Sequence, residues 1–340
     1  MDVDEIIESL KSNDQKTRDL LLHFFEESDF DDRDALFSEV IYESDAEDED
    51  LILRFFNLLG KENVIELAAE RLENEFSVPA SAATYLLSNK VAVNMLHNDI
   101  PIILKIVFET GTSEISEDYE VETENISNRV NAKPKHDNTS LKDIISKGAD
   151  LKLLDYEGQQ YFHMFMDEQN FEAMQLMLDS GYELHKKRDE MIFELEYLLT
   201  YVEEDAGILG ALYDSVVQDS FDEKDYDKYD KSEFCNHIRS FLYDQTETAE
   251  FLIKAGAKFS DISSEGKPIT KLIENMEKRY FKINIDRMYR GREFRFSGLI
   301  NANFPELGKL PEKIEGSKFI RRLIQFKVEK LRKLSSELNN

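Results

Sequence analysis

The chain has 340 residues, 41% of them hydrophobic, so it can bury a sizeable core, and this argues against wholesale disorder. The chain has only 13 glycines and 6 prolines, and these low counts argue against an all-β protein with many tight turns. The net charge of −29 is uneven: residues 267–340 hold 18 Lys and Arg against 9 Asp and Glu, which leaves an acidic body and a basic C-terminal fifth. Such a body repels nucleic acid and anionic membranes and attracts basic partners, although acidity more commonly serves solubility alone.

Residues 1–112 are predicted to form an acidic region of short amphipathic helices. The expected helices are 3–11, 15–27, 33–43, 49–59, 62–75, 81–89 and 99–110. The stretch 51-LILRFFNLL-59 has almost no polar face, so its helix should be buried by neighbours on several sides. Short helices with short connections predict stacked helical hairpins.

Residues 113–140 have few apolar side chains and no clear period, which predicts a long acidic surface loop or linker. Three later segments then share one pattern, in which an apolar helix end is followed by glycine and a short turn. These segments are 141-LKDIISKGADLKLLDYEG-158, 174-MQLMLDSGYELHKKRDE-190 and 249-AEFLIKAGAKFSDISSEG-266. Gly148 and Gly181 lie 33 residues apart.

This pattern resembles the ankyrin repeat, whose period is about 33 residues. The resemblance puts Asp155 and Gly158 in the turn and His163 at the histidine of the family's Thr-Pro-Leu-His motif. Gly148 should cap a helix in a left-handed conformation, and Gly158 is expected to have a positive φ as well. The chain departs from the family at 160-QY-161, where Thr-Pro would stand, and at 165-FM-166, where two alanines would stand.

Degenerate ankyrin-like repeats are therefore expected over residues 141–275. The distance from Gly181 to Gly256 exceeds two periods, so either an insertion near 216–234 or one enlarged helical pair must fill it. Residues 276–340 are expected to form a basic C-terminal cap. Within it, 289-YRGREFRFSGL-299 predicts a short strand or an irregular wrap, and 316–338 an amphipathic basic helix, which either covers the last repeat or lies on an anionic membrane.

The sequence contains no convincing catalytic signature, so no catalytic residue, cofactor or metal site is expected. Cys235 and His237 are two residues apart, and on a helix such side chains point away from each other. The single cysteine requires no oxidising compartment. No apolar run approaches the ~20 residues that span a bilayer, and MDVDEIIESL does not read as a signal peptide. We expect a cytoplasmic protein, with signal-independent secretion left open.

The expected fold class is an all-α solenoid of helical hairpins. The resemblance to ankyrin repeats implies a non-catalytic protein-binding module whose turn tips and first helices hold a partner. Carried onto this chain, it nominates Leu153, Tyr156, Gln160, Met164, Asp167 and Glu168. The acidity favours a basic protein partner with no direct nucleic-acid contact, as for an inhibitor or immunity protein. The alternatives are an ankyrin-type adaptor or secreted effector that engages host proteins, and an enzyme with an unrecognised site near Cys235 and His237.

Overall fold

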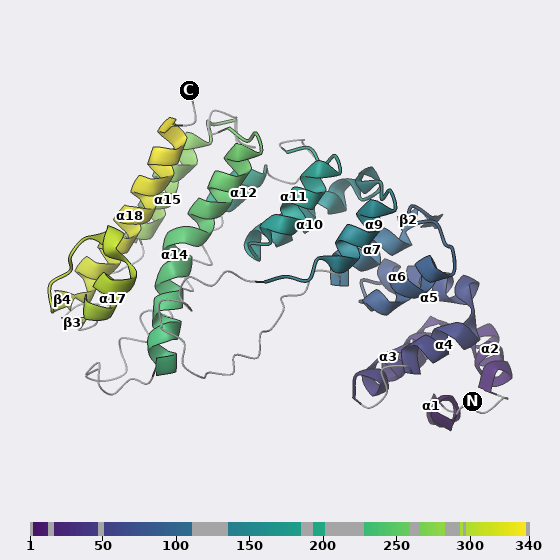
Figure 1. The fold of residues 1–340 in the computed structure, drawn as a ribbon. Coiled ribbons are helices and arrows are strands. Elements are labelled where there is room, and N and C mark those ends of the chain that lie inside the picture. Colours follow the sequence, from purple (N-terminus) through teal and green to yellow (C-terminus); the bar gives the residue numbers. More distant parts are fainter. Residues whose placement is uncertain are drawn as a thin grey trace. The chain divides into compact units, whose positions relative to one another are not determined.

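The computed structural model is mostly helical (Figure 1), which confirms the all-α prediction at the level of fold class. It describes residues 3–12, 17–46, 51–110, 135–184, 193–200, 228–258, 266–282, 293–294 and 297–337. Strands in these ranges are two-residue pieces. None of the helices in the same ranges combines the length and the apolar character that crossing a bilayer requires.

The described chain divides into two compact units. Unit 1 consists of Met1–Ile115, His136–Tyr161 and Gln175–Tyr182, and unit 2 of the remaining residues. The division falls inside two helices, α10 (Asp155–Asp167) and α11 (Phe171–Asp179).

The helices predicted for the start of unit 1 are confirmed within a few residues. They are α1 (Val3–Ser12), α2 (Thr17–Glu27), α3 (Phe30–Ala46), α4 (Leu51–Leu59), α5 (Lys61–Glu73), α6 (Ala80–Ser88) and α7 (Ile102–Thr110). Helix α4 is packed against α1, α2, α3, α5 and α6. Its Phe55 and Phe56 are fully buried and contact the ring of Phe37 from α3. The prediction that this helix lies inside the core is therefore confirmed.

The start of the seventh predicted helix is wrong, because a β-hairpin occupies its first residues. Strands β1 (Leu96–His97) and β2 (Ile100–Pro101) pair antiparallel. The two residues between them, Asn98 and Asp99, have φ values of 51° and 66°. Two successive positive φ values form the tight turn that suits a twisted hairpin. The turn lacks the glycine that usually announces it, so the pattern did not reveal it.

Three glycines end helices in the same way, as predicted for the first of them. The N–H of Gly148, whose φ is +83°, donates to the carbonyl of Ile145 at 2.9 Å, and the N–H of Ala149 donates to that of Ile144 at 3.1 Å. This pair of bonds satisfies helix carbonyls that would otherwise lack partners. The same two bonds close the helices before Gly181 and Gly256, whose φ values are +96° and +113°.

The same cap also occurs without glycine, which the sequence did not indicate. Glu75, Lys90 and Gln169 have φ values of 62°, 63° and 55°, and the residue after each donates to the carbonyl five positions back. A left-handed conformation costs an L side chain roughly 1–2 kcal/mol. The surrounding helices therefore hold these turns against a local preference.

Gly158 is not in a turn, which corrects the prediction made for it. Helix α10 begins at Asp155, and Gly158 lies inside it. The turn is completed earlier, because the side chain of Asp150 accepts the backbone N–H of Lys152 at 3.1 Å and starts a 3₁₀ turn, η1 (Leu151–Leu153). Asp150 therefore supplies the turn chemistry that was assigned to Asp155.

Substituting alanine for Gly148 and for Gly158 is expected to have opposite effects on stability. Gly148→Ala should lower the free energy of unfolding by about 1 kcal/mol, because the added Cβ must adopt a left-handed conformation. Gly158→Ala should raise it by about 0.5–1 kcal/mol, because alanine favours helix and its Cβ would meet Leu154 at an ordinary 3.6 Å. Urea unfolding of both variants measures this, and shifts of the same sign would contradict it.

Unit 2 is built around the long helix α14 (Lys228–Lys254). Helix α12 (Glu194–Thr200) and the C-terminal helix α18 (Gly316–Glu337) pack on it, and α15 (Thr270–Lys282) contacts both α12 and α18 (Figure 1). Strand β3 (Glu293–Phe294), inside the segment predicted as a strand or wrap, pairs antiparallel with β4 (Ile314–Glu315). The remaining elements are α17 (Ser297–Asn303) and η2 (Pro305–Leu307).

The predicted C-terminal helix is confirmed, and its apolar side is buried within unit 2. The predicted stripe residues Ile320, Leu323, Ile324, Val328 and Leu331 are all buried, Leu334 is half-buried, and Leu338 lies outside the described residues. Lys327 is buried among them, with its Nζ 4.6 Å from the ring centre of Phe241 on α14 and 5.9 Å from that of Tyr280 on α15. The aromatic rings offer this cation a favourable electrostatic environment.

Two predicted segments lie largely outside the described residues. The loop 113–140 is described only from residue 135, and α9 (Thr139–Ser146) begins near its end. The insertion placed at 216–234 is described only from residue 228, and residues 228–234 form the beginning of α14.

Candidate protein-binding surface

The residues nominated from the repeat pattern lie on η1 and along α10. Gln160, Asp167 and Glu168 are exposed, Leu153 and Met164 are half-buried, and the side chain of Tyr156 lies outside the described part of the structure. Leu153 and Gln160 belong to unit 1, and Met164, Asp167 and Glu168 to unit 2. Asp167 accepts a hydrogen bond from the hydroxyl of Tyr197 at 2.7 Å. Desolvation by neighbouring protein atoms raises the pKa of the Asp167 carboxyl group, and the hydrogen bond from Tyr197 opposes that rise.

His163, matched to the histidine of the ankyrin motif, is buried in unit 2. Its ring stacks on Tyr197 from α12, with 4.0 Å between ring centres and 11° between planes. The side chain is therefore part of the packing of α10 against α12.

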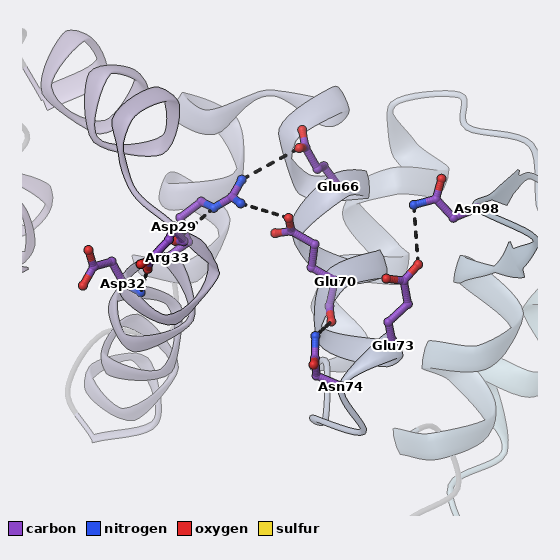
Figure 2. Close-up of polar contacts among 8 residues, drawn as sticks. All are labelled: Asp29, Asp32, Arg33, Glu66, Glu70, Glu73, Asn74 and Asn98. Carbon is purple, nitrogen blue, oxygen red and sulfur yellow. Dashed lines mark hydrogen bonds and ion pairs between the residues drawn. The ribbon is translucent and has the colours of Figure 1, made fainter.

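A row of carboxylates on α5 was not singled out from the sequence. Glu62, Glu66 and Glu70 follow one another at intervals of four residues and Glu73 comes three later, so all four lie on one side of the helix. We call these residues the α5 carboxylate row (Figure 2 draws Glu66, Glu70 and Glu73). The side chains of Glu62 and Glu66 are 80% and 53% exposed. Like charges at this spacing repel each other and destabilise the helix.

Arg33 from α3 balances part of this charge. Its guanidinium lies 2.9 Å from Glu70 Oε1 and 3.8 Å from Glu66 Oε1 (Figure 2). Arg33 is placed by the start of its own helix, where its Nε donates to the carbonyl of Asp29 at 3.3 Å and Asp29 Oδ1 accepts the N–H of Asp32 at 3.1 Å. The same turn carries two carboxylates, and that of Asp32 points away from α5 (Figure 2).

Glu70 is the most enclosed member of the row, with 27% of its side chain exposed. Burial raises its pKa, and the charges of Glu66 and Glu73 raise it further, while Arg33 lowers it. Its Oε2 atom is buried and accepts no hydrogen bond from the described residues. The folded protein therefore holds a carboxylate whose charge is only partly compensated.

Replacing Glu70 with glutamine is expected to stabilise the protein at neutral pH. Because the folded-state pKa of Glu70 is raised, its charged form disfavours folding at pH 7, and protonation relieves this as pH falls through the raised pKa. Glu70→Gln should therefore raise the free energy of unfolding at pH 7 by up to about 1 kcal/mol, and the gain should vanish below the ordinary pKa of glutamate. Urea titrations at pH 7 and below the ordinary pKa of glutamate test this, with Glu39→Gln as an exposed control. An equal gain in the free energy of unfolding at the two pH values would contradict it.

The β1–β2 hairpin lies at one end of the carboxylate row. Asn98 Nδ2 at its tip donates to Glu73 Oε1 at 3.4 Å (Figure 2), and β1 contacts α5. Leu96 on this hairpin is 47% exposed. Unit 1 thus places carboxylates and an exposed apolar side chain on neighbouring elements, and protein interfaces likewise combine an apolar centre with a polar rim.

A second group of titratable side chains in unit 1 forms an internal network. Lys105 Nζ on α7 lies 3.0 Å from Glu157 Oε1 on α10, and the hydroxyl of Tyr161 donates to Glu109 at 3.4 Å. Burial raises the pKa values of both Glu109 and Tyr161. Because Lys105 and Glu157 pair with each other and Tyr161 bonds Glu109, we interpret the group as support for the packing of α7 on α10.

A surface cavity of about 500 Å³ in unit 2 carries both signs of charge. Lys318, Arg321 and Arg322 line it together with Glu306 and Glu329. This mixture does not select a ligand of either charge.

Cys235 is buried inside α14, and burial raises the pKa of its thiol to about 12. The thiol therefore stays protonated near neutral pH, which disfavours a nucleophilic role. Among the described residues no group of histidine, cysteine and carboxylate side chains is arranged to hold a metal ion.

The glutamate spacing on α5 was visible in the sequence, inside the predicted helix 62–75. The ion pair between Glu70 and Arg33 was not visible, because these two residues are 37 positions apart in the sequence. Searches for similar proteins find no matching family model, no matching curated protein and no matching solved structure.

Proposed function

We propose that the protein is a non-catalytic binding module that captures and neutralises a basic protein, in the manner of an inhibitor or immunity protein. The observation that carries this proposal is the α5 carboxylate row, in which the charge of Glu70 is only partly compensated, in a chain of net charge −29. Ordinary solubility would be served equally well by carboxylates spaced apart.

Electrostatics supports a basic partner in two ways. The excess negative charge of the chain would steer a cationic protein and raise its association rate. Once bound, cations of the partner would relieve the repulsion between neighbouring glutamates on α5, so part of the binding free energy would come from removing a penalty present in the free protein.

The finer architecture is part of the same proposal. The helix ends at Gly148, Gly181 and Gly256 carry the same two hydrogen bonds, and the first two lie 33 residues apart. These features support a degenerate ankyrin-like solenoid whose residues 141–275 form the repeats and residues 276–340 the cap. In that arrangement the nominated residues on η1 and α10 are further contacts for the partner, and the module works in the cytoplasm.

A second candidate is an interaction adaptor or secreted effector that engages host proteins. The recurrent helix cap favours it as much as it favours an inhibitor, since both use a scaffold of repeats. The two candidates differ in the partner, because an adaptor does not need a basic one.

Affinity capture from the native cell type at low and at high salt, read by mass spectrometry, tests the proposal. A basic protein that is retained at low salt and lost at high salt would support the inhibitor. A salt-resistant partner of ordinary charge would favour the adaptor. If no protein is retained at either salt, the binding proposal is wrong.

A further inference from the structure

Two aromatic rings at the edge of unit 1 form a partly exposed pair. Phe30 opens α3 and Phe76 follows α5, and their rings stack with 6.2 Å between centres and 26° between planes. Phe76 keeps 44% of its surface exposed, and Phe30 is half-buried. We call these two side chains the Phe30–Phe76 pair. Covering the exposed part of the Phe76 ring with another surface would be favourable, because it removes apolar area from water.

The backbone on both sides of Phe76 is held in place. The N–H of Phe76 donates to the carbonyl of Arg71 at 2.9 Å, which completes the cap that puts Glu75 at a φ of 62°. Arg71 Nε in turn donates to the carbonyl of Ser77 at 3.0 Å. The backbone of Phe76 is therefore fixed, although this requires Glu75 to adopt an unfavourable left-handed conformation. Fixed aromatic side chains lose little entropy on binding and serve well as anchors.

The surroundings of the pair are acidic. Phe30 stands between Asp29 and Asp31 in the sequence, and Glu75 precedes Phe76 directly; all three are exposed. Arg71 lies over the Phe76 ring with its Cζ 5.7 Å from the ring centre, but its charge is already balanced by an ion pair with Asp34. The three residues that flank the two rings in the sequence therefore carry negative charge, and the neighbouring Arg71 does not cancel it.

We propose that the Phe30–Phe76 pair is the anchor point for an arginine side chain of the basic partner. Arginine combines an apolar stem and a planar cation that packs on aromatic rings, and its guanidinium also pairs with carboxylates. Arg71 shows the same combination inside the protein, with its guanidinium beside Phe37 and Phe76 and paired with Asp34. The inference rests on the proposed function, because it specifies how the same basic partner would be held.

A second copy of this chain fits the surface less well. Two copies joined through the Phe30–Phe76 pair would bring their own Asp29, Asp31 and Glu75 side chains together, and like charges facing one another oppose association. A cationic partner has the opposite effect on the same carboxylates.

The test compares oligo-arginine with oligo-lysine of equal length, each fluorescently labelled and titrated against the full chain at low salt. Both peptides carry the same charge, so they differ in the packing and pairing of the guanidinium. The unsubstituted protein should bind oligo-arginine about threefold to tenfold more tightly than oligo-lysine. Phe76→Ala and Phe76→Leu should remove this preference and leave oligo-lysine binding unchanged. Tyr42→Ala, which removes a different exposed aromatic side chain, on α3, should preserve it.

The outcomes separate this inference from the proposed function. If neither peptide binds, the acidic binding surface itself is wrong. If both bind and the preference is absent, or survives both Phe76 substitutions, the arginine anchor is wrong while the acidic surface stands. If Phe76→Ala instead turns a dimer into a monomer in sedimentation, the pair covers a second copy and the inference is overturned. Urea unfolding of each variant verifies that it is folded.

Discussion

Replacing Arg71 with alanine is expected to lower the free energy of unfolding by about 3–5 kcal/mol. Arg71 is only 5% exposed, and it joins its own helix α5 to α3 and to the segment that follows α5. Its guanidinium pairs with Asp34 of α3, donates to Ser77 beyond the end of α5, and lies 4.9 Å from the ring centre of Phe37. Alanine would leave Asp34 without its cation and open a cavity beside Phe37.

Two further variants separate the charge of Arg71 from its geometry. Arg71→Lys keeps the positive charge, but the lysine cannot reach Asp34 and Ser77 together. The free energy of unfolding of this variant should therefore lie between those of the original protein and of Arg71→Ala. Arg33→Ala removes a nearby arginine with 16% side-chain exposure, whose partners are the more exposed Glu66 and Glu70, and should cost about 1 kcal/mol or less. Urea unfolding measures all three. A loss below about 1 kcal/mol for Arg71→Ala would contradict its place in the core.

Reversing the charge of the α5 carboxylate row is expected to weaken binding of the basic partner by about 100-fold or more at low salt. The variant carries Glu62→Lys, Glu66→Lys and Glu73→Lys. It keeps Glu70, the closer partner of Arg33, and removes the more distant partner Glu66. The reason is local: the variant replaces carboxylates that would face the cations of the partner with cations that repel them.

A matched variant distinguishes this local effect from net charge. Glu8→Lys, Glu26→Lys and Glu39→Lys change the net charge of the chain by the same amount, but on α1, α2 and the exposed surface of α3. This variant should lose less than about tenfold in affinity, since only long-range steering is reduced. Equal losses in the two variants, measured by titration with the captured partner, would show that the row is no special contact site.

The helices of this protein could be predicted because their information is local. Apolar residues at helical spacing place α4 and α18 within two residues of their observed bounds, and the absence of a polar face on α4 foretells its burial. The helix ends were harder. Glycine announces the cap at Gly148, whereas Lys90 and Gln169 adopt the same backbone only because the packed helices around them require it.

Where the sequence was compatible with two local structures, the prediction was wrong. Both Asp150 and Asp155 can start a turn, and the structure uses Asp150, so Gly158 falls inside a helix. Asn98 and Asp99 form a hairpin turn without glycine, which hides β1 and β2. The candidate surface shows the same limit, since the spacing of its glutamates is local but Arg33 and the Phe30–Phe76 pair join α3 to distant residues.

The affinity of the captured partner measured across a range of salt concentrations tests the central claim most directly. If the protein is an electrostatically steered inhibitor, the logarithm of the dissociation constant should rise steeply and linearly with the logarithm of salt concentration. The slope should be smaller for the variant in which the charge of the α5 carboxylate row is reversed. An affinity that does not change with salt, or a slope that is the same in the reversed variant, would contradict it.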